Sequence, residues 1–311
     1  MAGVHLTNLI ELGHRVSVFS EAGAAELVAG TPATTVDDYE ALLDDVDWVL
    51  IATPTDSHFD FAVRALRRGR DVIVEKPLAR TYREAIELAE LADSVGRRLL
   101  PGHVVRFFPE YVQLQRAVSS GALGSLAVLR FTRAGSFPTR SAWFADVARS
   151  GGIVFDQMLH DLDFARWLAG DVVAVSAVSR HDGSGTSPVQ AAHVTLRHAS
   201  GAITLSSGVW GAQHLEFRTS FSVAGTGGIL EHDSAGERPS TAQLDHDHPI
   251  DGLLPARDAA EDPYLTELTA FLDPDADPTR IVSARDGAEA VRIAEAALAS
   301  LATGRPARLS T

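Results

Sequence analysis

Short apolar runs alternate with amphipathic stretches over the first third of the chain. Residues 16–19, 48–52 and 71–74 are dominated by apolar and β-branched side chains, as expected of parallel strands that are buried on both faces. Helical spacing of apolar residues falls between and after these runs, at 36–43, 57–68 and 82–95. This alternation predicts an α/β domain of the Rossmann-like, doubly wound type, with a parallel sheet.

The rhythm changes at Pro101-Gly102, which predicts a boundary between a first domain at 1–101 and a second at 102–311. Beyond this point the pattern predicts helices at 109–120, 153–169, 264–272 and 284–301, and a polar loop at 233–261. Strand-like runs follow one another with few helices between them, at 126–134, 172–179, 191–197, 202–209, 215–224 and 228–232. Closely spaced strands are typical of antiparallel pairing, so the second domain is predicted to be α+β with an open, mostly antiparallel sheet.

The beginning of the sequence matches only part of a dinucleotide-binding unit, which starts with a strand, a Gly-rich turn and a helix. Gly3 and His5 stand at the end of such a turn and in the first helical turn, because Leu6 and Leu9 continue with helical spacing. The first strand and the leading glycines are absent from the sequence, and in the usual order that strand lies in the middle of the sheet. We therefore expect either a gene product that starts upstream or a domain without its phosphate cradle, with two internal strand edges unpaired.

Composition and charge exclude several classes of function. Of 311 residues, 41 are acidic and 27 basic, a formal net charge of −14 that argues against binding of a nucleic-acid backbone. The absence of cysteine excludes disulfides, thiolate metal sites and cysteine nucleophiles. Neither a membrane-spanning apolar run nor a secretory signal is found, so a cytoplasmic protein is expected. The run Asp245-His246-Asp247-His248 is interpreted as a solvated loop, and no metal is assigned.

Two polar segments follow predicted parallel strands, where the loops at the carboxyl ends line a ligand crevice. Thr53-Pro54 and His58 come after the second strand, although this segment also suits an ordinary strand-to-helix turn. Glu75 and Lys76 come after the third strand, where the ammonium would face a substrate oxygen. The alternative for that pair is a surface ion pair of little consequence.

Asp156, His160 and Asp163 are spaced i, i+4 and i+7 on one predicted helix, which puts all three on one face. A carboxylate one turn from a histidine fixes its ring and raises its basicity, and this suits a general base near neutral pH. The alternative is a buried histidine that the neighbouring aspartate satisfies structurally. Ionisable residues on a face that otherwise carries core residues favour the functional interpretation.

Together these pieces resemble the oxidoreductase family of glucose–fructose oxidoreductase, inositol dehydrogenase and rhizopine-catabolism proteins (Gfo/Idh/MocA). The likeness spans nearly the whole chain. It is carried by Gly3-Val4-His5, Ala52-Thr53-Pro54 with His58, Glu75-Lys76-Pro77, Gly102-His103 with Arg106-Phe107, Gly151-Gly152 with Asp156, His160-Asp161-Leu162-Asp163, Trp167-Leu168, and Gly304-Arg305-Pro306-Ala307-Arg308-Leu309.

The resemblance implies a Rossmann domain that binds NAD or NADP, a sugar, inositol or related polyol as substrate, and a homo-oligomer formed through the second domain's sheet. It implies Lys76, Asp156 and His160 as catalytic residues. It implies cofactor binding by Gly3, His5, Ser20, Thr53, Pro54, His58, Glu75 and Lys76. Substrate contacts are expected from Lys76, His103, Arg106, Asp156, His160 and Asp163.

The residue chemistry agrees with hydride transfer from a secondary alcohol to a nicotinamide. His160, oriented by Asp156, takes the hydroxyl proton, and Lys76 stabilises the alkoxide-like charge. Two positions depart from the family pattern. Met158 occupies a position that is often glycine, which is expected to reshape the pocket wall. Ser20 stands where an acidic residue would bind the ribose hydroxyls of NAD, which leaves NAD and NADP both open.

Two other functions remain as alternatives. The first is a non-catalytic binding or assembly protein that has lost its cofactor together with the first strand. The second uses Lys76 as a Schiff-base nucleophile in a lyase or aldolase. Glu75 beside Lys76 favours a charged lysine and so disfavours the second alternative.

Overall fold

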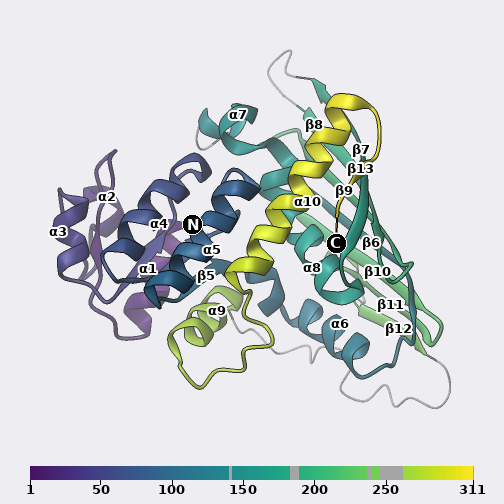
Figure 1. Ribbon diagram of the computed structural model, residues 1–311, viewed down its shortest axis with the longest axis horizontal. Coiled ribbons are helices and arrows are strands. Elements are labelled where there is room, and N and C mark those ends of the chain that lie inside the picture. Colours follow the sequence, from purple (N-terminus) through teal and green to yellow (C-terminus); the bar gives the residue numbers. More distant parts are fainter. Residues whose placement is uncertain (140–141, 183–188, 237–239, 245–261, 311) are drawn as a thin grey trace. The chain divides into compact units, whose positions relative to one another are not determined.

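The computed structural model describes residues 1–139, 142–182, 189–236, 240–244 and 262–310 (Figure 1). The chain divides into two compact units. The first combines Met1–Phe107 with a later segment that contains α9 (Pro263–Leu272), and the second runs on from Phe108 and resumes at Glu289. The boundary expected after residue 101 falls before Phe107, where this stretch of the first unit ends.

The largest difference between the expected domain ranges and the two units concerns the segment that contains α9. This helix was expected in the second domain, but it packs within the first unit, where Leu268 and Phe271 join Ile73, Leu100 and Phe107 in one buried cluster. The packing of α9 in the first unit is explained by these two large apolar side chains, because the burial of each is worth about 1.5–3 kcal/mol.

The first unit has two parallel ladders rather than one continuous sheet. β1 pairs with β2, and separately β3 pairs with β4 and β4 with β5, all in parallel. The sequence predicted this interruption from the absence of a first strand. The elements are α1 (Ala2–Glu11), β1 (Ser17–Val18), α2 (Ala25–Val28), β2 (Thr34–Thr35), α3 (Tyr39–Asp44), β3 (Trp48–Ile51), a 3₁₀ turn η1 (Thr55–Ser57), α4 (His58–Arg67), β4 (Asp71–Glu75), α5 (Tyr82–Val95), β5 (Leu99–Gly102) and η2 (Val104–Phe107).

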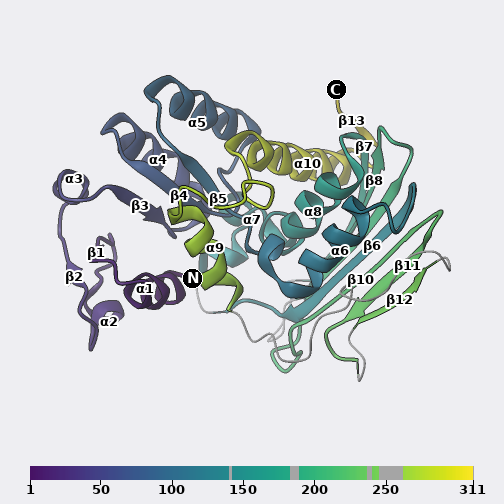
Figure 2. The same ribbon diagram turned by 90° about the horizontal axis from the view of Figure 1, so that it is seen from below.

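Helices cover both faces of the β3–β5 ladder (Figure 2). α4 and α5 pack on one face, and α9, which also contacts α1, lies on the other. α5 starts with a capping box in which Thr81 and Glu84 satisfy each other's backbone N–H groups, and it ends at Gly96 in the left-handed conformation. The near-continuous apolar strands therefore have apolar partners on both sides, as their sequence predicted.

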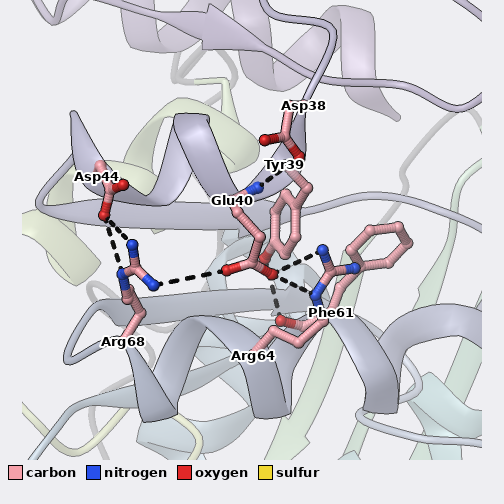
Figure 3. A network of polar contacts seen from close by, with 7 residues as sticks. All are labelled: Asp38, Tyr39, Glu40, Asp44, Phe61, Arg64 and Arg68. Atoms are coloured by element: carbon pink, nitrogen blue, oxygen red, sulfur yellow. Dashed lines mark hydrogen bonds and ion pairs between the residues drawn. The ribbon is translucent and has the colours of Figure 1, made fainter.

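A network of polar contacts attaches α3 to α4 (Figure 3). Asp38 caps α3, and Glu40 accepts a 2.7 Å hydrogen bond from Arg64, whose guanidinium lies 4.6 Å from the centre of the Tyr39 ring. The Tyr39 hydroxyl in turn donates to the carbonyl of Phe61 at 3.0 Å. These contacts join α3 to α4.

The second unit is built on one eight-stranded sheet with the order β12-β11-β10-β6-β9-β8-β7-β13. Only the central β6–β9 pair is parallel among these pairings; the others are antiparallel, which confirms the predicted open, mostly antiparallel sheet. The elements are α6 (Pro109–Ser119), β6 (Leu126–Ser136), η3 (Ala142–Ala145), α7 (Val147–Ser150), a π-helix η4 (Val154–Met158), α8 (Leu159–Ala169), β7 (Val172–Asp182), β8 (Val189–His198), β9 (Ile203–Gly211), β10 (Arg218–Gly225), β11 (Gly228–Asp233), β12 (Ser240–Leu244), α10 (Ala284–Thr303) and β13 (Ala307–Arg308).

Helices cover one face of this sheet. α6 and α8 lie on the face that buries Leu129, Phe131, Phe221 and Val223, and within the described parts of the unit the opposite face carries no helix (Figure 2). A buried ion pair joins the layers, because the Arg133 guanidinium of β6 binds Asp161 of α8 at 2.8 Å and the Tyr111 hydroxyl of α6 at 3.0 Å.

Two sequence predictions for the second unit were wrong in detail. The predicted loop at 233–261 contains a strand, β12, which extends the sheet by pairing with β11. The predicted helix at 153–169 starts as a π-helix before it continues as α8. The run at 245–248 lies outside the described residues. Among the helices that the structure describes, none is both long and apolar enough to cross a membrane.

Candidate active site

The carboxyl ends of β3, β4 and β5 lie side by side at one edge of the first unit's ladder. In the parallel register Ile51 lies opposite Val74, and Glu75 lies opposite Gly102. The segments that follow, with Thr53-Pro54, Lys76 and His103, therefore emerge next to one another. This edge is where ligands bind in open parallel sheets.

His58 ties two of these loops together. It is 1% exposed, and its ring nitrogens lie 2.8 Å from the carbonyl oxygen of Pro77 and 3.0 Å from that of Thr53. Burial lowers the pKa of His58, so the ring is neutral near pH 7 and its single N–H serves one of the two carbonyls. His58, predicted to bind cofactor, thus lies behind the loops and positions Thr53 and Lys76-Pro77.

Glu75 holds the backbone of the catalytic candidate Lys76. Its carboxylate accepts a 2.6 Å hydrogen bond from His5 Nε2 and a 3.1 Å bond from the Lys76 N–H. Burial alone would raise the pKa of Glu75, but the hydrogen bond from His5 and the positive charge of Lys76 keep that pKa below its usual range. The ionised carboxylate fixes the start of the loop, and the Lys76 side chain remains half-buried at the edge.

Glu267 is a buried acidic residue that the sequence analysis did not single out. It lies on α9, is 1% exposed, and its Oε1 has no hydrogen bond among the described residues. Burial, reinforced by the negative charge of Glu75, raises its pKa well above the usual range. The one sequence signal was a glutamate within an otherwise uncharged helix at 264–272.

A cavity of about 660 Å³ opens beside these loops in the first unit. It brings together four of the predicted cofactor residues, His5, Ser20, Thr53 and Pro54, while β1 and β3 supply apolar walls. Apolar walls with polar groups at the carboxyl ends of the strands fit a dinucleotide at this rim.

The other predicted residues of the first unit occupy different surroundings. Gly3 is exposed in the first turn of α1, where an added Cβ would meet only the Leu27 side chain, at 3.7 Å. His103 and Arg106 are 1% and 3% exposed, so they lie beneath the edge formed by the strand ends. Substrate contacts from these two residues remain a prediction.

In the second unit, Asp156, His160 and Asp163 lie on η4 and α8 as one continuous helical segment. Two glycines with positive φ, Gly151 and Gly152, precede it; a Cβ on Gly151 would come within 2.5 Å of Phe155. Val154–Met158 is a π-helix, so the turn that leads from Asp156 toward His160 is wider than the α-helical turn that the sequence predicted. Asp156 and His160 are half-buried, whereas Asp163 is 4% exposed.

Met158 is fully buried and packs against Gly208 of β9. An added Cβ at Gly208 would lie 2.6 Å from Met158 Cγ, so the large side chain on the helix is matched by a glycine on the strand. Met158 therefore forms part of the core between η4 and the sheet, where the sequence analysis expected an altered pocket wall.

Comparison with known families and proteins gives matches over most of the chain. Residues 9–103 match the profile of an oxidoreductase family with an NAD-binding Rossmann fold, and residues 111–231 match the profile of the GFO/IDH/MocA C-terminal domain. Inositol 2-dehydrogenase 2 of Saccharopolyspora erythraea is 27% identical over an alignment 319 residues long. The alignment covers 98% of this chain and 87% of that protein.

Two further matches differ in extent. The scyllo-inositol 2-dehydrogenase (NAD(+)) of Bacillus subtilis is 32% identical over 194 residues, 61% of this chain and 55% of that protein. The solved structure of a levoglucosan dehydrogenase with NADH and levoglucosan is similar with a TM-score of 0.81, at 19% identity, over 99% of this chain and 95% of that one. At this identity the structural match supports the fold alone.

Proposed function

Because this chain belongs to the Gfo/Idh/MocA family of NAD-binding oxidoreductases, we propose that it oxidises a secondary alcohol of an inositol, a related polyol or a cyclic sugar. The observation that carries this proposal is the edge where β3, β4 and β5 end, with Lys76 directly after the middle strand and Glu75 anchoring its backbone. The names of the inositol dehydrogenases to which the chain is similar favour a polyol.

The cofactor is assigned to the loops at this edge. Thr53 and Pro54 follow β3, and Ser20 follows β1, where the adenosine ribose is held in dinucleotide-binding folds. When bound, the nicotinamide accepts a hydride from the substrate carbon. Ser20 offers a hydroxyl rather than a carboxylate to the ribose, so both NAD and NADP belong in the assay.

Residues of the chain accept the proton of the substrate hydroxyl. In the proposed reaction the His160 imidazole takes the proton of the substrate hydroxyl, and the C–H electron pair leaves as hydride while the carbonyl forms. The Lys76 ammonium stabilises the negative charge that develops on the oxygen, and Asp156 orients the imidazole. The proposal therefore requires Lys76 and His160 to act on one hydroxyl in the bound complex.

Substitution of His160 tests the assignment of the base. With a panel of inositols and cyclic sugars, His160→Ala is expected to lower kcat for cofactor reduction by at least about 100-fold, the contribution of a general base. His193→Ala is the matched control, because His193 alternates with buried residues of β8 and so faces away from the helices, with its ring 2.8 Å from the Ser207 hydroxyl. Equal turnover of His160→Ala and the unaltered chain would remove His160 from this role.

The helix-free face of the second unit's sheet supports a second proposal, a homo-oligomer. Val178 and Ile203 are 67% and 43% exposed on strands of this sheet, and exposed apolar side chains on a sheet favour association. Light scattering is expected to give a multiple of the 33.1 kDa chain mass, reduced by Val178→Lys. A monomer at all concentrations would refute the proposal.

A further inference from the structure

Two buried polar atoms of the first unit have no hydrogen bond among the described residues, and both belong to side chains around Glu75. One is Nδ1 of His5, a residue of α1 that is 3% exposed. The other is Oε1 of Glu267, a residue of α9 that is 1% exposed. Buried polar groups are nearly always hydrogen-bonded, because the bonds to water that are lost on burial have to be replaced. Two such atoms around one carboxylate therefore call for a common explanation.

Contacts between α1 and α9 place both side chains in the same region. The ring of His5 meets the ring of Tyr264 edge-on, with centres 6.1 Å apart, and Tyr264 precedes Glu267 by three residues on α9. Residues three apart in a helix lie on the same face, so Glu267 faces α1 as Tyr264 does. His5 bonds Glu75 directly, and the charge of Glu75 acts on Glu267. His5 and Glu267 thus border the same carboxylate from two helices.

The hydrogens that these groups carry make the two atoms complementary. Glu75 is ionised and can only accept, so His5 Nε2 bears the hydrogen of the 2.6 Å bond, and Nδ1 of the neutral imidazole is then an acceptor. Burial and the charge of Glu75 raise the pKa of Glu267, so its carboxyl keeps a hydrogen that needs an acceptor. The region therefore contains one unused acceptor and one unused donor.

The charges around Glu267 come from three neighbouring parts of the first unit. Apart from Tyr264 on α9 itself, the buried and half-buried ionisable side chains there are His5 of α1, Glu75 and Lys76 at the end of β4, and His103 and Arg106 at η2. Glu75 is the one whose charge raises the pKa of Glu267. A second ionised carboxylate beside Glu75 would repel it, so a hydrogen kept on Glu267 leaves a single negative charge behind Lys76.

We propose that Glu267 is a positioning residue for Lys76, and that its carboxyl hydrogen serves Nδ1 of His5 through one buried water. This inference rests on the function proposed above, in which the Lys76 ammonium acts on the substrate oxygen. The bonded series runs from Glu267 to His5, from His5 Nε2 to Glu75, and from Glu75 to the Lys76 N–H at 3.1 Å. A water completes it because no hydrogen bond joins His5 Nδ1 to Glu267 directly, and buried waters typically bridge such groups. The series fixes the His5 ring, and with it the start of the loop that carries Lys76.

Variants of Glu267 test the series with magnetic-resonance readouts that do not require turnover. Glu267→Leu removes the donor, whereas Glu267→Gln keeps one in its amide N–H. In Glu267→Leu the nitrogen chemical shift of His5 Nδ1 is expected to move toward that of an unbonded nitrogen. Hydrogen exchange at the Lys76 amide is expected to speed up by about tenfold or more in the same variant. Glu267→Gln is expected to keep both values of the unaltered chain.

Asn8→Leu is the matched control. It breaks another contact between α1 and the start of α9, the 3.2 Å hydrogen bond from Asn8 to Asp262, without touching Glu75. Neither the His5 Nδ1 signal nor the exchange of the Lys76 amide is expected to change in this variant. Equal changes in Asn8→Leu and Glu267→Leu would overturn the proposal, because a general loosening of the packing between the two helices would then explain them.

Turnover separates positioning from binding. With a substrate that the unaltered chain oxidises, Glu267→Leu is expected to lower kcat by about tenfold with a smaller change in KM, because a displaced Lys76 stabilises the developing charge less well. Glu267→Gln is expected to restore most of kcat. If the unaltered chain oxidises no member of the panel, the proposed function fails, while the two magnetic-resonance readouts still decide whether Glu267 orients His5 and Lys76.

Other results would also refute the series. An unchanged His5 Nδ1 signal in Glu267→Leu would mean that His5 has another donor. A changed signal with unchanged exchange at Lys76 would refute the step from His5 to Lys76. If Glu267→Leu fails to fold, the unaltered chain decides, because the carbon chemical shift of the Glu267 carboxyl and the nitrogen chemical shift of His5 Nδ1 are expected to titrate with one midpoint. Two separate midpoints would overturn the proposal.

Discussion

Glu267 predicts a measurable dependence of stability on pH. Its carboxyl is 1% exposed, and burial together with the charge of Glu75 raises its pKa well above the value of 4.5 expected in the unfolded chain. Between these two pKa values the folded chain keeps a proton that the unfolded chain releases. The free energy of unfolding therefore falls as pH rises above about 4.5, by up to about 1.4 kcal/mol per pH unit, until pH passes the folded pKa.

Substitution by glutamine removes this proton and keeps the size of the side chain. In urea unfolding at a series of pH values from about 5 to 8, Glu267→Gln is expected to lose the downward slope that this residue contributes. The buried amide shifts the whole curve by a constant, so the slope rather than the absolute stability is compared. Glu87→Gln is the matched control, because it makes the same change at an exposed position on α5.

The carboxylate of Glu75 provides a second test of the pH dependence attributed to Glu267. Glu75→Gln removes the negative charge that helps to raise the pKa of Glu267, so the downward slope is expected to end at a lower pH. If the curves of Glu267→Gln and the unaltered chain run parallel over the whole range, Glu267 ionises as an ordinary carboxyl does. The reasoning from its burial would then be wrong.

Three other substitutions test contacts in the two units. Arg133→Met leaves Asp161 buried without its guanidinium partner and is expected to lower the free energy of unfolding in urea by about 3–5 kcal/mol. Adding Asp161→Leu is expected to recover most of this loss, and a loss below about 1 kcal/mol for Arg133→Met would contradict the reasoning. Gly208→Val places side-chain atoms against Met158 and is expected to lower the free energy of unfolding by about 1–3 kcal/mol, a loss that Met158→Ala should relieve. An unchanged free energy of unfolding in Gly208→Val would show that η4 moves freely. Glu40→Ala breaks only exposed contacts between α3 and α4 and is expected to cost about 1 kcal/mol or less, and a larger loss would mean that this network (Figure 3) stabilises the unit strongly.

The regular elements of both units could be predicted because the pattern of apolar residues along the sequence indicates which positions are buried. The runs at 48–52 and 71–74 are apolar on both faces, and the structure places β3 and β4 there with helices on each side. The sequence could also predict the interruption of the first sheet, because strand order follows from the number of strand–helix units. β12 was missed because three of its five residues are polar and none of the five is buried, so it lacks the apolar pattern of the other strands.

The candidate site was predictable in part. Lys76 and Thr53 could be assigned to one edge because each follows a parallel strand. The hydrogen bond between His5 and Glu75 joins residues far apart in the sequence, so no local pattern indicated it. The π-helix that contains Asp156 was not predicted either, because the spacing of its five residues also fits an ordinary α-helix.

The single parallel pairing in the eight-stranded sheet has a kinetic consequence. β10 through β12 and β7 through β9 each form antiparallel ladders between strands that are neighbours in the sequence. β6 and β9 are different, because helices and two strands separate them along the chain. Val128 lies opposite Ile203 in that seam, so its closure carries a large loop entropy. Amides of β6 that bond across the seam should therefore gain protection after those of the β7–β8 ladder when refolding is followed by pulsed hydrogen exchange.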